Sequence, residues 1–381
     1  MNDHIETYKK LLDKKGRYKY VCMFGAGYAA NYWYRFLKDI GYKIDFFSDN
    51  DSNLWNRVIV DGIVCISPVE LLKYGIDMLC LVSTSALYTD EVVAQLKNMG
   101  LVVMGLDQHW MNIDEIVERY VGIDVRIPVY ENGEMGQYDR KICENERIAV
   151  YTCVVGNYDN LKQPKVIDEQ CDYYYLGLEK PNNLGVYHWI DIMPYMKYGM
   201  LDNTRANRYC KLHPHLFFND YKYSIYLDGG FEIRQSIVGL LKKIGNTGIG
   251  LYGKSLSGDV DTYGEAVFRL ITETISGDDK SIVIKQMKKY AREGFPRNFG
   301  SSHNAVIVRE HNDPNCIRIM ETWWNEIVNE CRRDELSFFY ALWKNGFSPK
   351  DVGYLGKTLR DTPEFKELGH NIDIYPKIYS R

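Results

Sequence analysis

Short apolar runs alternate with helical stretches from residue 17 to about residue 107, and this alternation most restricts how the chain can fold. Strands are predicted at residues 18–24, 43–49, 58–66, 78–82 and 101–106. A helix is predicted to follow the first strand up to about Ile40, with others starting at Pro68 behind a Ser67 N-cap and over residues 89–99. Strands that alternate with helices form βαβ units and a parallel sheet. Residues 1–110 are therefore predicted to form a Rossmann-like domain.

A polar segment with glycines separates this region from a second one. Residues 111–146 hold a predicted helix at 114–120, then Pro128 and the glycines Gly133 and Gly136, which is typical of a linker. A new apolar strand starts at residue 147. The expected fold class is α/β, with a linker at 111–146 and a second α/β domain at 147–381. Two domains also suit a length of 381 residues.

Composition excludes several classes of protein. The 47 Lys and Arg residues against 51 Asp and Glu residues give a net charge of −4, so nucleic acid is not an expected partner. No apolar run reaches the roughly 18–20 residues of a membrane span, and the first residues lack the apolar core of a signal peptide. Nine dispersed cysteines without a Cys-x-x-Cys pair indicate reduced thiols. The expected location is the cytoplasm.

A glycine-rich turn follows the first predicted strand. Gly25-x-Gly27-x-x-Ala30 lies between a strand and a helix, where a dinucleotide fingerprint belongs, and Asp49 ends the second strand, where a ribose-binding carboxylate belongs. These four residues are predicted to bind a nucleotide. The alternative is a Rossmann-like domain that keeps the turn without a ligand, with Asp49 a solvated turn residue. Residues 1–110 hold no dehydrogenase-like catalytic centre.

Three polar clusters of the second region are candidates for a ligand site at a sheet edge, and the first two are residues 156–159 and the cations of residues 205–211. Residues 156–159 follow a strand, and open α/β sheets bind ligands at that end. Arg205, Arg208 and Lys211 recur at i, i+3 and i+6 of a predicted helix that ends before Pro214. Three cations on one face are predicted to clamp a diphosphate, the alternative being a solvated basic face.

Asp228 ends another apolar strand, before two glycines. Nucleotide-sugar transferases place an Asp-x-Asp motif there to hold Mg²⁺ or Mn²⁺, but Gly230 stands in place of the second aspartate. Three interpretations stay open. A metal is bound by fewer carboxylates with a distant ligand such as His370, or the cations neutralise the diphosphate without a metal, or the segment is an ordinary turn between two strands.

The fourth cluster begins at Trp323-Trp324 and continues through Arg333-Asp334-Glu335. Its apolar pattern predicts two amphipathic helices against the sheet. Asp334 is either an ion-paired residue at a helix start or an active-site base that accepts the proton of an acceptor hydroxyl. The paired tryptophans are expected in the core rather than on a sugar-binding surface.

These clusters, in this order, resemble the glycosyltransferase-like family of the TOD/MUCI type, found in plant cell-wall and bacterial polysaccharide proteins. The resemblance covers residues 148–343. It is carried by residues 155–159, 205–215, 226–229, 293–296, 323–324 and 333–338. The chain departs from the family pattern at Glu335, where Gln is expected, and at Gly253-Lys254, where a His-Pro-like pair is expected. The N-terminal region resembles nucleotide-binding domains attached to bacterial surface-polysaccharide enzymes.

The family is similar to GT-A glycosyltransferases, which implies a nucleotide-sugar donor and an Asp-containing metal motif. By this resemblance Asp228 and Asp334 are catalytic, and Mn²⁺ or Mg²⁺ is bound by Asp228, with His370 as the proposed distant ligand. The predicted donor-site residues are Gly156, Asn157, Tyr158, Asp159, Arg205, Arg208, Lys211 and His215.

The expected activity is transfer of a sugar to a glycan or lipid-linked acceptor in capsular or lipopolysaccharide-type polysaccharide biosynthesis, with peripheral association to a membrane-bound assembly. Two alternatives remain. One is a nucleotide- or NAD-dependent sugar-modifying enzyme centred on Gly25 and Gly27. The other is a non-catalytic scaffold module.

Overall fold

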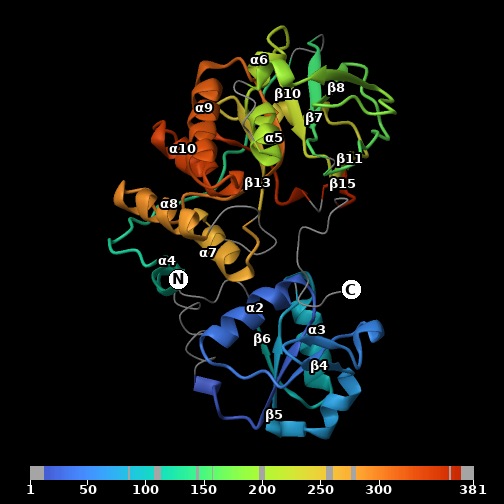
Figure 1. Cartoon of the computed structure of the whole chain (residues 1–381), viewed down its shortest axis with the longest axis vertical. Helices are drawn as coiled ribbons and strands as arrows, with labels where there is room; N and C mark the ends of the chain where they lie inside the picture. The colour runs from blue at the N-terminus through green and yellow to red at the C-terminus, as the bar shows by residue number, and fades with distance from the viewer. Residues whose placement is uncertain are drawn as a thin grey trace.

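Two β-sheets, each flanked by helices, organise the chain (Figure 1). The computed structural model describes residues 13–84, 86–106, 113–142, 146–156, 158–196, 202–254, 261–275, 280–359 and 362–369. A six-stranded sheet lies in the N-terminal part and a seven-stranded sheet in the C-terminal part. The predicted α/β class is confirmed.

The six-stranded sheet has the order β3-β4-β2-β1-β5-β6. Its strands are β1 (Tyr20–Phe24), β2 (Phe46–Ser48), β3 (Val58–Val60), β4 (Ile63–Ile66), β5 (Met78–Val82) and β6 (Val102–Gly105). Every pairing is parallel except that of β3 with β4. Helices α2 (Tyr28–Asp39) and α3 (Ala86–Asn98) follow β1 and β5. The predicted alternation of strand and helix is therefore confirmed here.

The segment that begins at Pro68 is a 3₁₀ helix, η2 (Pro68–Lys73). Ser67 caps it as predicted, because its hydroxyl accepts the backbone N–H of Glu70 and the Glu70 carboxylate accepts the backbone N–H of Ser67. The other 3₁₀ helices of the described chain are η1 (Ser52–Leu54), η3 (Gly75–Asp77), η5 (Met193–Tyr195), η6 (Val238–Lys243), η7 (Asp334–Leu336) and η8 (Pro349–Asp351).

The seven-stranded sheet has the order β14-β12-β13-β10-β7-β8-β9. Its strands are β7 (Ile148–Cys153), β8 (Cys171–Gly177), β9 (Tyr187–Asp191), β10 (Tyr223–Leu227), β12 (Ile249–Gly253), β13 (Ser302–Arg309) and β14 (Gly353–Gly356). Strand β13 is antiparallel to β10 and β12, so this sheet is mixed. Strands β7 and β10 are parallel neighbours, with Tyr151 opposite Tyr226. Their carboxyl ends therefore lie at the same edge.

In Figure 1 helices α5, α9 and α10 lie on one side of this sheet, and a two-stranded sheet of β11 (Phe231–Ile233) and β15 (Phe365–Glu367) lies near it. The helices of the described chain after β6 are α4 (Ile113–Val121), α5 (Asn203–Leu212), α6 (Pro214–Phe217), α7 (Thr262–Thr272), α8 (Lys280–Arg292), α9 (Pro314–Asn329) and α10 (Phe338–Lys344). The predicted helix pair after β13 corresponds to α9 and α10. Trp323 is fully buried, as expected for a core residue.

Helix α7 connects the two sheets, and in Figure 1 it lies between them together with α8. The Phe268 ring stacks on Tyr32 of α2 with centroids 5.1 Å apart, and Glu273 pairs with Arg35 of α2 at 2.7 Å. One apolar core runs through both sheets along this route.

The predicted linker is packed against the C-terminal part rather than extended. Val129 bridges to Arg297 and Gly136 bridges to Gly353. The Tyr130 N–H donates to Arg297 at 2.8 Å, and the Gly136 N–H donates to Val352 at 2.8 Å. Residues 128–136 therefore behave as part of the C-terminal unit.

The eight cysteines within the described residues are buried, and none of them is bridged to another. None of the described helices combines the length and the apolar character needed to cross a membrane.

Candidate active site

Helix α5 brings cationic side chains to the edge where β7 and β10 end. Asp202 caps the helix by accepting the N–H groups of Thr204 and Arg205, each at 3.0 Å, and Pro214 stops it. Ala206, Cys210 and Leu212 are buried, and the helix packs against β7 and α9. This packing fixes which way the remaining side chains of α5 point.

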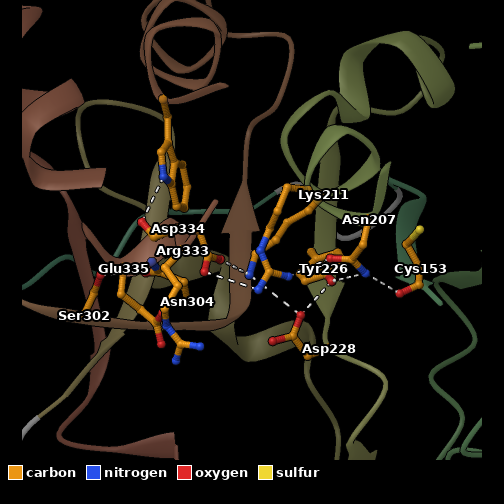
Figure 2. A network of polar contacts seen from close by, with 12 residues as sticks. Cys153, Asn207, Lys211, Tyr226, Asp228, Ser302, Asn304, Arg333, Asp334 and Glu335 are labelled. Atoms are coloured by element: carbon orange, nitrogen blue, oxygen red, sulfur yellow. Dashed lines mark hydrogen bonds and ion pairs between the residues drawn. The ribbon is translucent and has the colours of Figure 1, made fainter. Parts of the chain in front are cut away.

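Arg208 and Lys211 of α5, Asp228 after β10 and Asp334 of η7 form one ionic network (Figure 2). The Nζ of Lys211 lies 2.6 Å from Oδ2 of Asp334 and 3.7 Å from Oδ1 of Asp228. The Nη2 of Arg208 lies 3.4 Å from Oδ1 of Asp334. Residues from three distant segments therefore meet in one network, and two of the three predicted cations are among them.

Asp334 lies at the buried end of this network. Its side chain is 3% exposed, and Trp323 donates its indole N–H to the Asp334 carbonyl at 3.0 Å. Burial opposes ionisation of Asp334, but the charges of Arg208 and Lys211 outweigh burial and hold its pKa below the usual value. A carboxylate so held is a weak proton acceptor, and it anchors the two cations.

Asp228 is the accessible carboxylate of the network, since its side chain is 25% exposed. Its Oδ1 accepts the Tyr226 hydroxyl at 2.6 Å. Burial, followed by the charge of Asp228, raises the pKa of Tyr226 well above its usual value, so this hydroxyl stays protonated as a donor. Asn207 donates to the Cys153 carbonyl at 2.6 Å and so ties α5 to the end of β7. The orientation of Asp228 is therefore fixed by its neighbours.

A second set of charged side chains, the outer cluster, lies beside η7. It comprises Lys254, Glu265, Arg269, Arg333 and Glu335. Glu265 pairs with Lys254 at 2.5 Å and with Arg269 at 2.6 Å, and Glu335 lies 3.7 Å from Arg269 and 3.3 Å from Arg333. Burial opposes ionisation of Glu335, but Arg333 and Lys254 hold its pKa well below the usual value. Sequence analysis gave no site role to these residues.

Two predicted donor-site residues lie elsewhere. Arg205 points to the end of α9, where its Nε donates to the Ile327 carbonyl at 3.0 Å and its Nη2 to the Glu330 carbonyl at 2.9 Å. His215 lies beyond the end of α5, 3.6 Å from Glu321. The predicted three-cation clamp therefore reduces to Arg208 and Lys211 in the ionic network.

The loop after β7 lies close to Asp228. Gly156 has φ +74°, which favours glycine, and Asn157 lies outside the described residues. Tyr158 is partly buried and packs against the apolar core, and Asp159 is buried next to Gly229. A small hollow lies beside Gly229 and is lined also by Thr152, Val154 and Leu227. It has room for about one water molecule, so it is not a preformed pocket for a nucleotide sugar.

The described residues around Asp228 do not fit a divalent metal site. Mg²⁺ and Mn²⁺ prefer several oxygen ligands, but Gly230 replaces the second aspartate, and Lys211 and Tyr226 approach Oδ1 of Asp228. Within the described ranges no three His, Cys, Asp or Glu side chains are grouped as metal ligands. His370 lies outside those ranges.

The glycine turn of the six-stranded sheet is held by Asp49. Gly25 has φ +100°, and a Cβ there would lie 3.2 Å from the Ser83 carbonyl, so the tight turn requires glycine. Gly27 precedes α2, and Ala30 is fully buried. The Asp49 carboxylate accepts the Ala26 N–H at 2.8 Å and the Asp51 N–H at 2.9 Å. Asp49 therefore fixes the turn, and nucleotide binding there stays a prediction.

The ionic network lies in the part of the chain that is similar to a known family model. Residues 176–352, slightly less than half of the chain, match the model of the TOD1/MUCI70 glycosyltransferase-like domain. That span contains α5, β10, β13 and η7, and so the whole network. No curated protein matches the chain. The resemblance seen in the sequence is confirmed for this span, which begins after residues 155–159.

Proposed function

We propose that the chain is a glycosyltransferase that moves a sugar from a nucleotide-diphosphate sugar to a glycan or lipid-linked acceptor. The observation that carries this proposal is the meeting of Arg208, Lys211 and Asp228 at the shared edge of β7 and β10. Open α/β sheets bind ligands at this edge, and the family match covers all three residues.

In this reaction the bond between the sugar C1 and the diphosphate oxygen breaks, and its electron pair leaves with the nucleoside diphosphate. A bond forms between C1 and the acceptor oxygen, whose proton passes to a carboxylate. Cations beside the leaving group stabilise the negative charge that develops on it. Such electrostatic stabilisation is usually the largest single contribution to the rate enhancement. Arg208 is the cation of the network best placed for this, because its side chain is 20% exposed whereas Lys211 is 1% exposed.

We assign the two carboxylates different roles. Asp228 is the solvent-accessible carboxylate, and it takes the proton from the hydroxyl group of the acceptor. Asp334 is a positioning residue, because its oxygens contact Lys211 and Arg208 inside the protein. Its low pKa supports this assignment over the role of general base.

A panel of nucleotide sugars tests the proposal. Release of the free nucleoside diphosphate is measured for each donor with an oligosaccharide acceptor mixture, with Mn²⁺ and with EDTA. Turnover of any donor supports the transferase. If no donor turns over while NAD binds to the folded protein, the sugar-modifying alternative replaces it. If no donor turns over and NAD does not bind, the non-catalytic scaffold module replaces the transferase as the proposed function.

We further propose that this activity serves cytoplasmic assembly of a capsular or lipopolysaccharide-type glycan, in peripheral association with a membrane-bound assembly. The N-terminal sheet with its glycine turn, which resembles domains attached to surface-polysaccharide enzymes, supports this setting. Deletion of the gene from its host, followed by analysis of the surface glycan, tests it. An unchanged glycan contradicts it.

A further inference from the structure

We propose that Arg208, Arg333 and Asn304 bind the donor diphosphate directly, in a site that requires no divalent cation. This inference rests on the proposed function and adds how the donor is held. The donor-site residues predicted from the sequence did not include Arg333 or Asn304.

Each of these side chains has a buried donor that makes no hydrogen bond within the described structure. The atoms are Nε of Arg208, Nε of Arg333 and Nδ2 of Asn304. Asn304 is 3% exposed. A buried N–H without an acceptor destabilises the fold, so such donors are rare unless a ligand or water accepts from them. Three of them around one network indicate an acceptor-rich ligand.

The other contacts of Arg208 and Asn304 use other atoms than these donors. The Asn304 Oδ1 accepts the Ser302 hydroxyl at 2.7 Å, so its amide nitrogen is the atom left for a ligand. The Arg208 Nη1 donates to Asn207 at 2.6 Å. The Arg333 Nε lies 3.3 Å from Oε2 of Glu335 as an ion pair, without the alignment of a hydrogen bond. Figure 2 shows Arg333, Asn304 and Asp228 gathered around the Lys211–Asp334 pair.

The charges of this region favour an anion. The ionic network and the outer cluster together hold five cations, Arg208, Lys211, Lys254, Arg269 and Arg333. They hold four carboxylates, Asp228, Glu265, Asp334 and Glu335. The balance is 5 − 4 = +1 before a ligand binds. A guanidinium is always charged and its fork matches phosphate oxygens, so Arg208 and Arg333 supply the positive charge that a metal supplies elsewhere.

Binding of nucleoside diphosphates by calorimetry tests this inference. UDP, GDP, ADP and CDP are titrated into the full chain with excess EDTA and again with Mn²⁺. We expect the preferred nucleotide to bind with Kd values that agree within about threefold in the two conditions. Arg333→Gln and Asn304→Ala are expected to weaken binding about 10- to 100-fold. Arg292→Gln is the matched control, since Arg292 is exposed on α8 and pairs with Asp124.

The outcomes separate this inference from the proposed function. Binding that needs Mn²⁺ overturns the inference and leaves the transferase in place. Metal-free binding that Arg333→Gln and Asn304→Ala leave unchanged also overturns it. If none of the four diphosphates binds in either condition, the proposed function fails as well. Circular dichroism of each variant confirms folding, and these two variants are used because Arg208 also holds Asp334.

Discussion

The Nζ of Lys211 lies 2.6 Å from Oδ2 of Asp334, and the two side chains are 1% and 3% exposed. These residues are 123 positions apart, so their contact holds η7 against α5. Two charges that are buried together offset much of their desolvation cost, but a charge left alone does not. The pair therefore couples the integrity of the site to the stability of the fold.

Replacement of Asp334 by Asn is expected to lower the free energy of unfolding by about 3–5 kcal/mol, because it leaves Lys211 and Arg208 without their buried partner. Urea unfolding measures this change. The control is Asp61→Asn, because Asp61 forms an exposed pair with Lys38 and should cost less than about 1 kcal/mol. Equal losses in the two variants would contradict the structural role of Asp334.

Replacement of Asp228 by Asn is expected to reduce donor turnover at least about 100-fold, as for the loss of a catalytic carboxylate. Stability should change little, since the side chain is 25% exposed and Lys211 keeps its contact with Asp334. Asp220→Asn, at an exposed position, is the control and should retain full activity. A folded Asp228→Asn variant with full activity would remove this residue from the mechanism.

Replacement of Gly229 by Ala tests the close packing beside Asp228. A Cβ at Gly229 would lie 2.9 Å from a methyl of Val154 and 3.0 Å from the carboxylate of Asp159. We expect a loss of about 1–3 kcal/mol in stability and a fall in activity as the loop after β7 shifts. Gly239→Ala is the control, because its Cβ would meet nothing within 4 Å. Similar behaviour of the two variants in thermal unfolding and turnover would contradict this packing.

Acid should destabilise the protein partly through Glu265. Burial opposes its ionisation, but Arg269 and Lys254 hold its pKa at about 2, below the ordinary 4.5. Its stabilising contribution is therefore complete above pH 4.5 and is lost as the pH falls from 4.5 towards 2. For this group the slope reaches about 1.4 kcal/mol per pH unit. Glu265→Gln should flatten the pH dependence of urea unfolding over that range, whereas Glu91→Gln, at an exposed position, should keep it. An unchanged slope in Glu265→Gln would refute the shift.

Local sequence patterns predicted the elements of the site well. Apolar runs predicted the ends of β7 and β10, and the spacing of the cations before Pro214 predicted α5. The cations and Asp228 were both expected to bind the donor diphosphate. The pattern could not show that Arg205 bonds to carbonyls at the end of α9, more than 120 residues away. Equal spacing along a helix does not give equal surroundings.

The outer cluster was missed for a related reason. Glu265 and Arg269 are spaced i and i+4, which is common on solvated helices, and only the burial of α7 makes the pair significant. Arg333 and Glu335 flank Asp334 in the fourth cluster, where Asp334 alone was assigned a candidate role from the sequence. Their partial burial follows from the packing of η7 against α7 and β13, which no short segment encodes.

The packing of residues 128–136 on the C-terminal sheet determines where the C-terminal half can be cut from the rest of the chain. A protein cut at residue 147 would lose the Val129–Arg297 and Gly136–Gly353 bridges and leave those edges without their covering chain. Helix α4 contacts α7 and α8 as well. A C-terminal fragment should therefore start ahead of Ile113, so that it keeps both bridges and the packing of α4 on α7 and α8.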